Sequence, residues 1–139
     1  MKLDSSLLVS GNQYYKNVLM ANGLGGYTST GVYNNMYRKH DGYLVASLES
    51  PQSRYVFLKR TTEYVNGVSL DSSETEEGKY AGYKFMTGFI FENFPVFTYE
   101  LKGTTIKKAV APIYGKNACS ITYEISCKEQ TKVDIVFEF

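Results

Sequence analysis

Hydrophobic and polar residues alternate along most of the chain after residue 40. In the stretch 118–127 the odd positions are Cys, Ile, Tyr, Ile and Cys, whereas the even positions are mostly Ser, Thr and Glu. An alternation of period two is typical of a β-strand that is buried on one face. The stretch 133–139 repeats this pattern. Both stretches are therefore predicted strands, and the short polar link 128–130 predicts that they form a hairpin.

Two more hairpins are indicated by turn residues between alternating stretches. Residues 63–70 turn at Asn66-Gly67, and residues 97–110 turn near Lys102-Gly103. Asn-Gly in particular accepts the positive φ angles of a type I′ turn. Residues 6–20 suit either a helix or a strand. Further predicted strands are 43–48, 55–59 and 85–91. Hairpins in series, with 3 prolines and 12 glycines, favour an all-β fold, an antiparallel β-sandwich.

Length and charge restrict the classes of function. The 139 residues predict a single domain over residues 1–139, and 15 Lys plus Arg nearly balance 14 Asp plus Glu. This balance argues against a nucleic-acid or anionic-membrane partner. No apolar run approaches the roughly 20 residues of a membrane span, and no signal-peptide pattern is present, so we expect a cytoplasmic protein. Acidic residues gather only in 71–79, a predicted solvated loop that contains Glu74, Glu76 and Glu77.

The two cysteines lie on one predicted strand. An extended chain advances about 3.3 Å per residue, which separates Cys119 from Cys127 by roughly 26 Å and excludes a disulfide within the strand. We interpret both as reduced thiols in the core, in agreement with a cytoplasmic location. The alternative, a redox or metal-binding role, finds no nearby partner residue in the sequence.

The glycine-rich stretch 22–30, NGLGGYTST, matches neither phosphate-binding motif. A dinucleotide fingerprint would need glycine where Thr28 stands, and a P-loop would need Lys and Ser/Thr where Val32 and Tyr33 stand. The single histidine, His40, has no second histidine at metal-ligand spacing, and no nucleophile-elbow motif occurs. The sequence therefore predicts no cofactor, no metal ligand and no catalytic residue.

Paired carboxylates and clustered tyrosines are the remaining candidate features. Glu63, Glu92 and Glu100 could supply acids for glycoside hydrolysis. The alternative interpretation places such acids on the solvated faces of strands.

A cluster of four tyrosines surrounds the glycines, and a tyrosine ring can stack on a pyranose while its hydroxyl bonds to sugar or water. The alternative is that these tyrosines pack within the sheets. They are Tyr27, Tyr33, Tyr37 and Tyr43.

Two consecutive segments carry a family resemblance. VLMANGLGGYTSTGV (18–32) followed by RKHDGYLVASL (38–48) resembles the opening of the N-terminal domain of bacterial and archaeal glycogen debranching enzymes, the amylo-α-1,6-glucosidase family. A looser similarity continues to the end of the chain. The chain departs from the family pattern at Asp41, where the family has histidine. His40 does not replace that histidine, because a shift of one residue in a strand reverses the face.

The resemblance implies a part of a larger enzyme. In the family, a β-sandwich of the galactose-mutarotase-like supersandwich kind precedes a helical toroid that carries the acids cleaving the α-1,6 bond. We therefore expect an N-terminal fragment without catalytic activity of its own. Its implied partners are an α-glucan, glycogen or a maltooligosaccharide, and the missing catalytic domain in cis. It would bind the glucan, brace the toroid, or do both.

The glycine stretch then has two interpretations. Gly23, Gly25 and Gly26 are expected to let the backbone take positive φ and to bring Tyr27 close to neighbouring chain. The alternative is a contribution to a glucan-contacting surface or to the interface with the catalytic domain. The residues expected to bind glucan under that alternative are Asn22, Tyr27, Arg38 and Lys39.

Other functions stay open. The chain could be a free-standing carbohydrate-binding module, or an interaction domain that uses open β-edges and tyrosines. The predicted strand 133–139 has no following turn, so its edge would stay unpaired, and a homodimer through that edge is the predicted consequence. A small mutarotase-like enzyme is disfavoured, because its chemistry needs a positioned acid and base.

Overall fold

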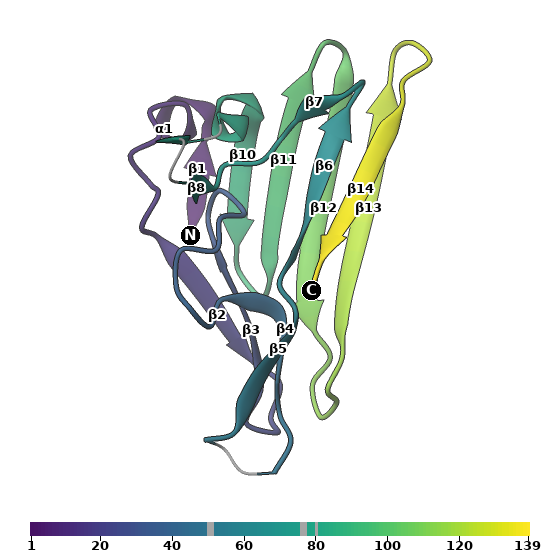
Figure 1. Ribbon diagram of the computed structural model, residues 1–139. Helices are drawn as coiled ribbons and strands as arrows, with labels where there is room; N and C mark the ends of the chain where they lie inside the picture. The colour runs from purple at the N-terminus through teal and green to yellow at the C-terminus, as the bar shows by residue number, and fades with distance from the viewer. Residues whose placement is uncertain (50–51, 76–77, 80) are drawn as a thin grey trace.

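The regular secondary structure of the chain consists mostly of antiparallel β-strands, arranged as two layers (Figure 1). The computed structural model describes residues 1–49, 52–75, 78–79 and 81–139. Within these residues the helical elements are short, α1 (Ser5–Leu8) and the 3-10 helix η1 (Gly82–Phe85). No helix in this part of the chain has the length and apolarity to cross a membrane. The prediction of an all-β sandwich is confirmed.

One layer is a five-stranded sheet with the order β1-β10-β11-β12-β13, in which all neighbours are antiparallel. Its strands are β1 (Lys2–Asp4), β10 (Met86–Phe91), β11 (Pro95–Leu101), β12 (Thr104–Pro112) and β13 (Cys119–Cys127). Buried and exposed residues alternate along β11 and β12, because one face of this sheet covers the core.

Two smaller sheets make the other layer. The first is β2 (Asn17–Ala21), β3 (Tyr27–Gly31), β4 (Gly42–Ser47) and β5 (Arg54–Leu58); the second is β14 (Val133–Glu138), β6 (Arg60–Val65) and β7 (Val68–Ser69). Lys59 joins them, because its carbonyl accepts from Tyr43 N at 3.1 Å and its N–H donates to Glu138 O at 2.7 Å. A separate small hairpin is formed by β8 (Glu74–Thr75) and β9 (Gly78–Lys79).

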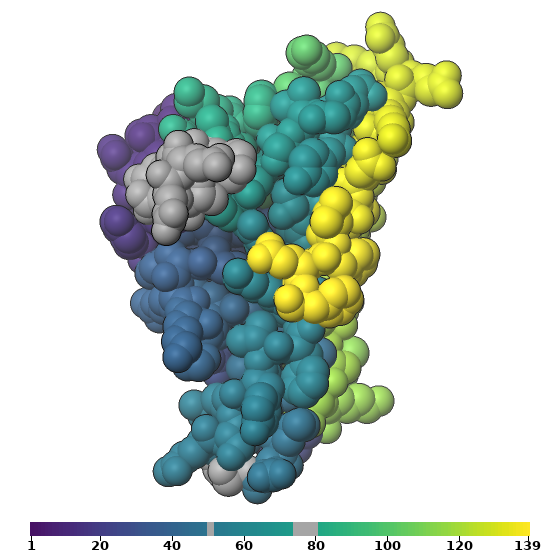
Figure 2. Space-filling model, in the orientation of Figure 1, coloured from purple at the N-terminus to yellow at the C-terminus, as the bar shows by residue number. Residues whose placement is uncertain are grey.

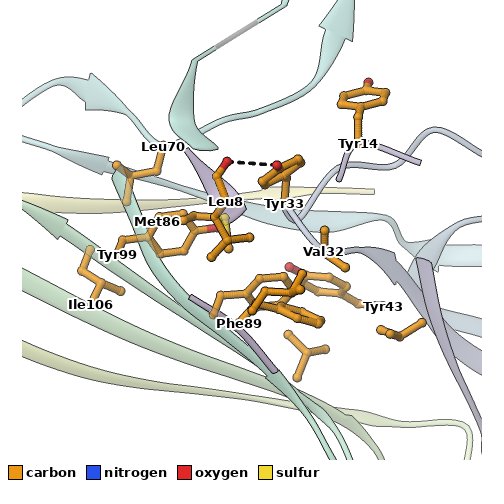
Figure 3. Packing of buried hydrophobic residues seen from close by; sticks show 14 of the residues in the cluster. Leu8, Tyr14, Val32, Tyr33, Tyr43, Leu70, Met86, Phe89, Tyr99 and Ile106 are labelled. Carbon is orange, nitrogen blue, oxygen red and sulfur yellow. Dashed lines mark hydrogen bonds between the residues drawn. The ribbon is translucent and has the colours of Figure 1, made fainter. Parts of the chain in front are cut away.

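The core fills the space between the layers (Figure 3). Phe89, Phe97 and Tyr99 come from the five-stranded sheet and are at most 1% exposed. Leu8 enters from α1, and its carbonyl accepts a hydrogen bond from the Tyr33 hydroxyl at 2.9 Å. The stretch 6–20, which suited helix or strand, therefore contains both: most of the one-turn helix α1 and the start of β2.

Two of the three predicted hairpins are confirmed. β6 and β7 turn at Asn66 and Gly67, whose φ angles are 47° and 80°. β11 and β12 turn at Lys102 and Gly103, with φ of 47° and 81°. Positive φ at both central residues is the signature of a type I′ turn, which the sequence predicted for Asn66-Gly67; for Lys102-Gly103 it predicted only the position of the turn.

The third predicted hairpin, between 118–127 and 133–139, is wrong. β13 pairs with β12 in one layer, and β14 pairs with β6 in the other. The link between them crosses the sandwich: Lys128 N donates to Gly103 O, and Lys132 N donates to Asn66 Oδ1. Alternation reports that a strand has a buried face, but both layers offer such a face, so it could not identify the partner.

Two predictions about exposure also need correction. Cys119 and Cys127 are free thiols, but only Cys119 is partly buried, and Cys127 is exposed because it ends an edge strand. The stretch 71–79 is not simply a solvated loop, because Ser72 is 2% exposed and Asp71 pairs with Arg60 at 2.7 Å. Glu76 and Glu77 lie outside the described residues.

Candidate functional site

The glycine stretch forms a tight loop between β2 and β3, organised around one asparagine. Gly23 and Gly25 have φ of +84° and +87°, a conformation that favours glycine. The Asn22 side-chain oxygen accepts from Leu24 N at 2.8 Å and from Gly26 N at 3.1 Å. Gly26 does not have positive φ; glycine is needed because a Cβ there would lie 2.5 Å from the Val45 carbonyl oxygen.

Asn22 also ties this loop to the loop between β12 and β13. Its Nδ2 donates to Lys116 O at 3.3 Å and to Asn117 Oδ1 at 3.2 Å, and its backbone carbonyl accepts from Gly115 N at 2.6 Å. An asparagine amide has two donor hydrogens and two acceptor lone pairs, and here all four are used. With the residue 2% exposed, its side chain holds two loops together.

Tyr27 follows the loop and is held from two sides. Its hydroxyl donates to the His40 carbonyl at 3.0 Å. The Arg54 guanidinium lies 5.7 Å from the centre of the Tyr27 ring, while Arg54 Nε donates to Gly25 O at 3.0 Å. Partial burial raises the pKa of the Tyr27 hydroxyl, an effect that the Arg54 charge opposes. The ring is thus fixed with part of its surface open to solvent.

A second turn, residues 38–41, presents exposed basic side chains beside Tyr27. Asp41 organises this turn: one carboxylate oxygen accepts from Arg38 N at 2.9 Å, and the other from Ser29 Oγ at 2.7 Å and Asn17 Nδ2 at 3.1 Å. Asp41 is 2% exposed. Its role was missed in the sequence, where it stood only as a departure from the family pattern, although Asp-Gly is a turn signal.

Tyr27 separates two adjoining shallow hollows. One, of about 200 Å³, is bordered by Arg38, Lys39 and His40, and the other, of about 420 Å³, by Arg54 and the glycine loop. Leu19 lines both hollows together with Tyr27. We call this region the Tyr27 surface, defined by Leu19, Gly23, Gly25, Gly26, Tyr27, Arg38, Lys39, His40 and Arg54.

The structure separates the predicted site residues into two groups. Tyr27, Arg38 and Lys39 line the Tyr27 surface, whereas Asn22 is buried behind it. The four clustered tyrosines divide in the same way. Tyr33 and Tyr43 are 0% exposed and belong to the core, so for them the packing interpretation holds. Tyr37 is partly exposed and carries the Arg38 guanidinium 5.4 Å from its ring centre.

A second polar cluster lies between the layers and was not foreseen. Lys108 Nζ, on β12, donates to Glu63 Oε1, on β6, at 2.7 Å, and the two side chains are 0% and 1% exposed. Lys108 Nζ also donates to Thr61 O at 3.0 Å, and the Tyr123 hydroxyl donates to Glu63 Oε1 at 2.5 Å. Burial lowers the pKa of Lys108, and Glu63 opposes this shift. We call these four residues the buried ion-pair cluster.

This cluster corrects the interpretation of Glu63 as a solvated strand residue, whereas Glu92 and Glu100 are exposed as expected. Sequence reasoning missed the pair because Lys107-Lys108 occurs in a strand where either lysine could face solvent. Alternation around Ile106 and Val110 was the available signal, since it places Lys108 on the buried face. Within the described residues no group of three or more His, Cys, Asp or Glu side chains is placed to hold a metal ion.

The fold and the Tyr27 surface define a β-sandwich domain with a fixed aromatic and basic surface over one sheet. Residues 16–138 match the family described as glycogen debranching enzyme N terminal. The chain therefore belongs to that family, in agreement with the resemblance seen in its sequence. Comparison with curated proteins and with solved structures found no match.

Proposed function

We propose that this chain is a non-catalytic domain of a cytoplasmic glycogen debranching α-1,6-glucosidase, and that the Tyr27 surface contacts the α-glucan. The observation that carries this proposal is the convergence of Tyr27, Arg38 and Lys39 on adjoining hollows of one face. A glucan presents apolar sugar faces and many hydroxyl groups. A fixed tyrosine ring can stack on the apolar sugar faces, and the basic side chains beside it can donate hydrogen bonds to the hydroxyl groups.

The four expected residues take different roles in this proposal. Tyr27 stacks on a glucose ring, and Arg38 and Lys39, both exposed, donate hydrogen bonds to its hydroxyls. Asn22 acts as a positioning residue, because its amide is already fully bonded to the protein. Gly23 and Gly25 supply the backbone angles that the loop requires.

Bracing of the catalytic toroid in cis is the other part of the proposal. It differs from the alternative of a free-standing carbohydrate-binding module in one measurable respect. A free-standing module binds glucan saturably as an isolated chain, whereas an accessory domain that shares its site with the toroid gains affinity when both domains are present.

A protein-interaction role is a second candidate, favoured by a separate observation. β13 and β14 are end strands of their sheets, and no strand among the described residues pairs with their outer edges. The homodimer predicted from the strand 133–139 remains a prediction of this second candidate.

The experiment is an amide NMR titration of the chain with a linear and a branched maltooligosaccharide. We expect shifts confined to residues 22–42 and to the neighbourhood of Arg54. Tyr27→Ala removes the stacking ring and is expected to weaken binding about fivefold or more, since stacked aromatic contacts are worth about 1 kcal/mol.

Tyr55→Ala is the matched control. Tyr55 is also an exposed tyrosine on a strand of the same sheet, 53% exposed, but it lines neither hollow. Its removal should leave glucan binding unchanged. Unchanged spectra at millimolar sugar, or equal effects of the two variants, would contradict glucan contact at the Tyr27 surface.

A further inference from the structure

β13 is an edge strand whose outer backbone groups have no partner strand among the described residues. Lys128 N donates to Gly103 O and Ile113 N donates to Ala118 O, so the even positions around β13 point their backbone groups toward β12. The N–H and C=O groups of successive residues in an antiparallel strand point to opposite sides. The N–H and C=O groups of the odd positions from Cys119 to Cys127 therefore point toward the open edge. Figure 1 shows β13 at the margin of the five-stranded sheet.

The usual protections of an edge strand are missing from β13. Edge strands generally carry lysine, proline or a bulge that discourages pairing with another chain. β13 has none of these: its nine residues contain one charge, Glu124, and its register with β12 is uninterrupted. Its core-facing side is also poorly covered, because Ile125 is 41% exposed whereas its cross-strand partner Ile106 is 1% exposed.

The sequence of β13 is almost the same in both directions. It reads CSITYEISC, so positions equally far from Tyr123 carry the same residue except for Thr122 and Glu124. Two antiparallel copies aligned at Tyr123 therefore place Cys119 opposite Cys127, Ser120 opposite Ser126, and Ile121 opposite Ile125. Such a self-complementary strand is what a two-fold symmetric interface requires.

We propose that two copies of this chain associate through β13, antiparallel, with the two-fold axis at Tyr123. The two five-stranded sheets then continue into one sheet across the interface. The charges are compatible with this register, because each Glu124 lies opposite an uncharged Thr122. A shift by two residues in one direction would set the two Glu124 side chains opposite each other, which is unfavourable, and a shift in the other direction would lose the matched pairs of cysteines and isoleucines. The proposed interface uses none of the residues that define the Tyr27 surface, so it can be tested separately from glucan binding.

The register can be tested with the native cysteines. In a hydrogen-bonded antiparallel pair the Cα atoms are about 5.5 Å apart, within the range that a disulfide accepts. Glutathione disulfide serves as oxidant: two thiols lose two electrons and two protons to form one disulfide, and one glutathione disulfide becomes two glutathione molecules. We expect a dimer linked between Cys119 of one copy and Cys127 of the other, identified by peptide mass spectrometry.

Random collision gives a different product. Cys127 is the exposed thiol and Cys119 is partly buried, with its pKa raised by burial. Collisional oxidation would therefore favour links between two Cys127 residues. That product, or no covalent dimer, would overturn the proposed register.

A second measurement needs no oxidation. Under reducing conditions, sedimentation should show a monomer–dimer equilibrium in which Thr122→Glu weakens dimerisation several-fold and Thr122→Lys strengthens it, because residue 122 faces Glu124 of the second copy. Ser126→Glu and Ser126→Lys are the controls: residue 126 faces the uncharged Ser120, so both should have the same effect. A monomer at millimolar concentration, or equal effects of the two Thr122 variants, would overturn the proposal.

Discussion

At the scale of single residues, the same amino acid has different roles on opposite faces of a strand. Lys107 is exposed on the outer face of β12, while Lys108 is buried against Glu63. Removing a charge from water is unfavourable, and the direct ion pair, its hydrogen bonds and the Tyr43 ring, whose centre lies 5.0 Å from Lys108 Nζ, compensate for it. The buried ion-pair cluster therefore stabilises one specific alignment of β6, β12 and β13, since each of these strands supplies a member.

Breaking this pair gives the first prediction. Lys108→Met leaves the Glu63 carboxylate buried without its partner and should reduce the free energy of unfolding by about 3–5 kcal/mol. Adding Glu63→Gln removes the uncompensated charge and should restore part of that loss. Urea denaturation at pH 7 measures both.

Lys107→Met is the matched control, because it removes a lysine from the adjacent exposed position. We expect a change within about 0.5 kcal/mol. A similar decrease in the free energy of unfolding for Lys107→Met and Lys108→Met would show that the ion pair does not stabilise the fold more than an exposed lysine does.

Gly26 gives the second prediction at this scale. A Cβ at residue 26 would meet the Val45 carbonyl oxygen at 2.5 Å and Asn22 Nδ2 at 2.7 Å. Gly26→Ala should therefore destabilise the chain by roughly 1–3 kcal/mol and shift the amide NMR signals of both the glycine loop and residues 113–117, which Asn22 connects.

Gly67→Ala provides the comparison. Gly67 has positive φ, but a Cβ at this residue would have no neighbouring atom within 4 Å. Its substitution strains only the β6–β7 turn, at a cost of about 1–2 kcal/mol. If Gly26→Ala leaves residues 113–117 unshifted, the proposed link through Asn22 is wrong.

At the scale of elements, Arg60 joins three segments of one layer. Its Nε donates to Glu138 on β14 at 2.8 Å, and its Nη1 donates to Asp71, which follows β7, at 2.7 Å. Burial alone would raise the pKa of Asp71 and of Glu138. Hydrogen bonds and the positive charge of Arg60 outweigh it, and the pKa of both carboxyl groups is lowered.

The third prediction is the resulting dependence on pH. A carboxyl group with a lowered pKa in the folded state stabilises the fold above its ordinary pKa of about 4, because the unfolded chain binds more protons below that value. The free energy of unfolding should therefore fall as pH decreases from about 5 toward about 2. Arg60→Met should flatten this dependence in urea denaturation curves collected across that range.

Lys132→Met is the control for this prediction. Lys132 pairs with Asp134 at 3.6 Å, but both side chains are largely exposed, 77% and 46%, and exposed pairs contribute little. Its removal should leave the acid slope unchanged. An unchanged slope in Arg60→Met would assign the acid sensitivity to other groups.

At the scale of the whole molecule, the polypeptide passes repeatedly between layers. β1 and β2 lie in different layers, the chain returns to the five-stranded sheet between β7 and β10, and the link 128–132 crosses from β13 to β14. In Figure 2 the C-terminal segment lies along one margin of the molecular surface. Because segments alternate between the layers, neither layer can pack its buried face without the other.

The fourth prediction follows for the single domain expected over residues 1–139. Urea unfolding should be one cooperative transition, with coincident midpoints from far-UV circular dichroism and tyrosine fluorescence. Amide NMR signals of the β2–β5 sheet and of the five-stranded sheet should disappear at the same urea concentration. Separate midpoints for these two sheets would contradict a single cooperative domain.

The sequence by itself determined the local features of this protein. Period-two alternation predicted most of the strands after residue 40, because a half-buried strand must alternate; β1 and β3 were not predicted. Asn66-Gly67 predicted one turn, because both residues tolerate positive φ, and Gly103 between alternating stretches indicated another. The glycine stretch and the 38–48 segment indicated the family, to which residues 16–138 belong.

Only the tertiary structure decided which strands pair and which polar groups are buried. It separated β13 from β14, buried Glu63 against Lys108, and turned the Asn22 amide inward between two loops. It also placed Arg38 and Lys39 beside Tyr27. These outcomes depend on contacts between residues that are distant in the chain. The local pattern of hydrophobic and polar residues does not show which distant segment pairs with a strand edge, a buried charge or a buried amide.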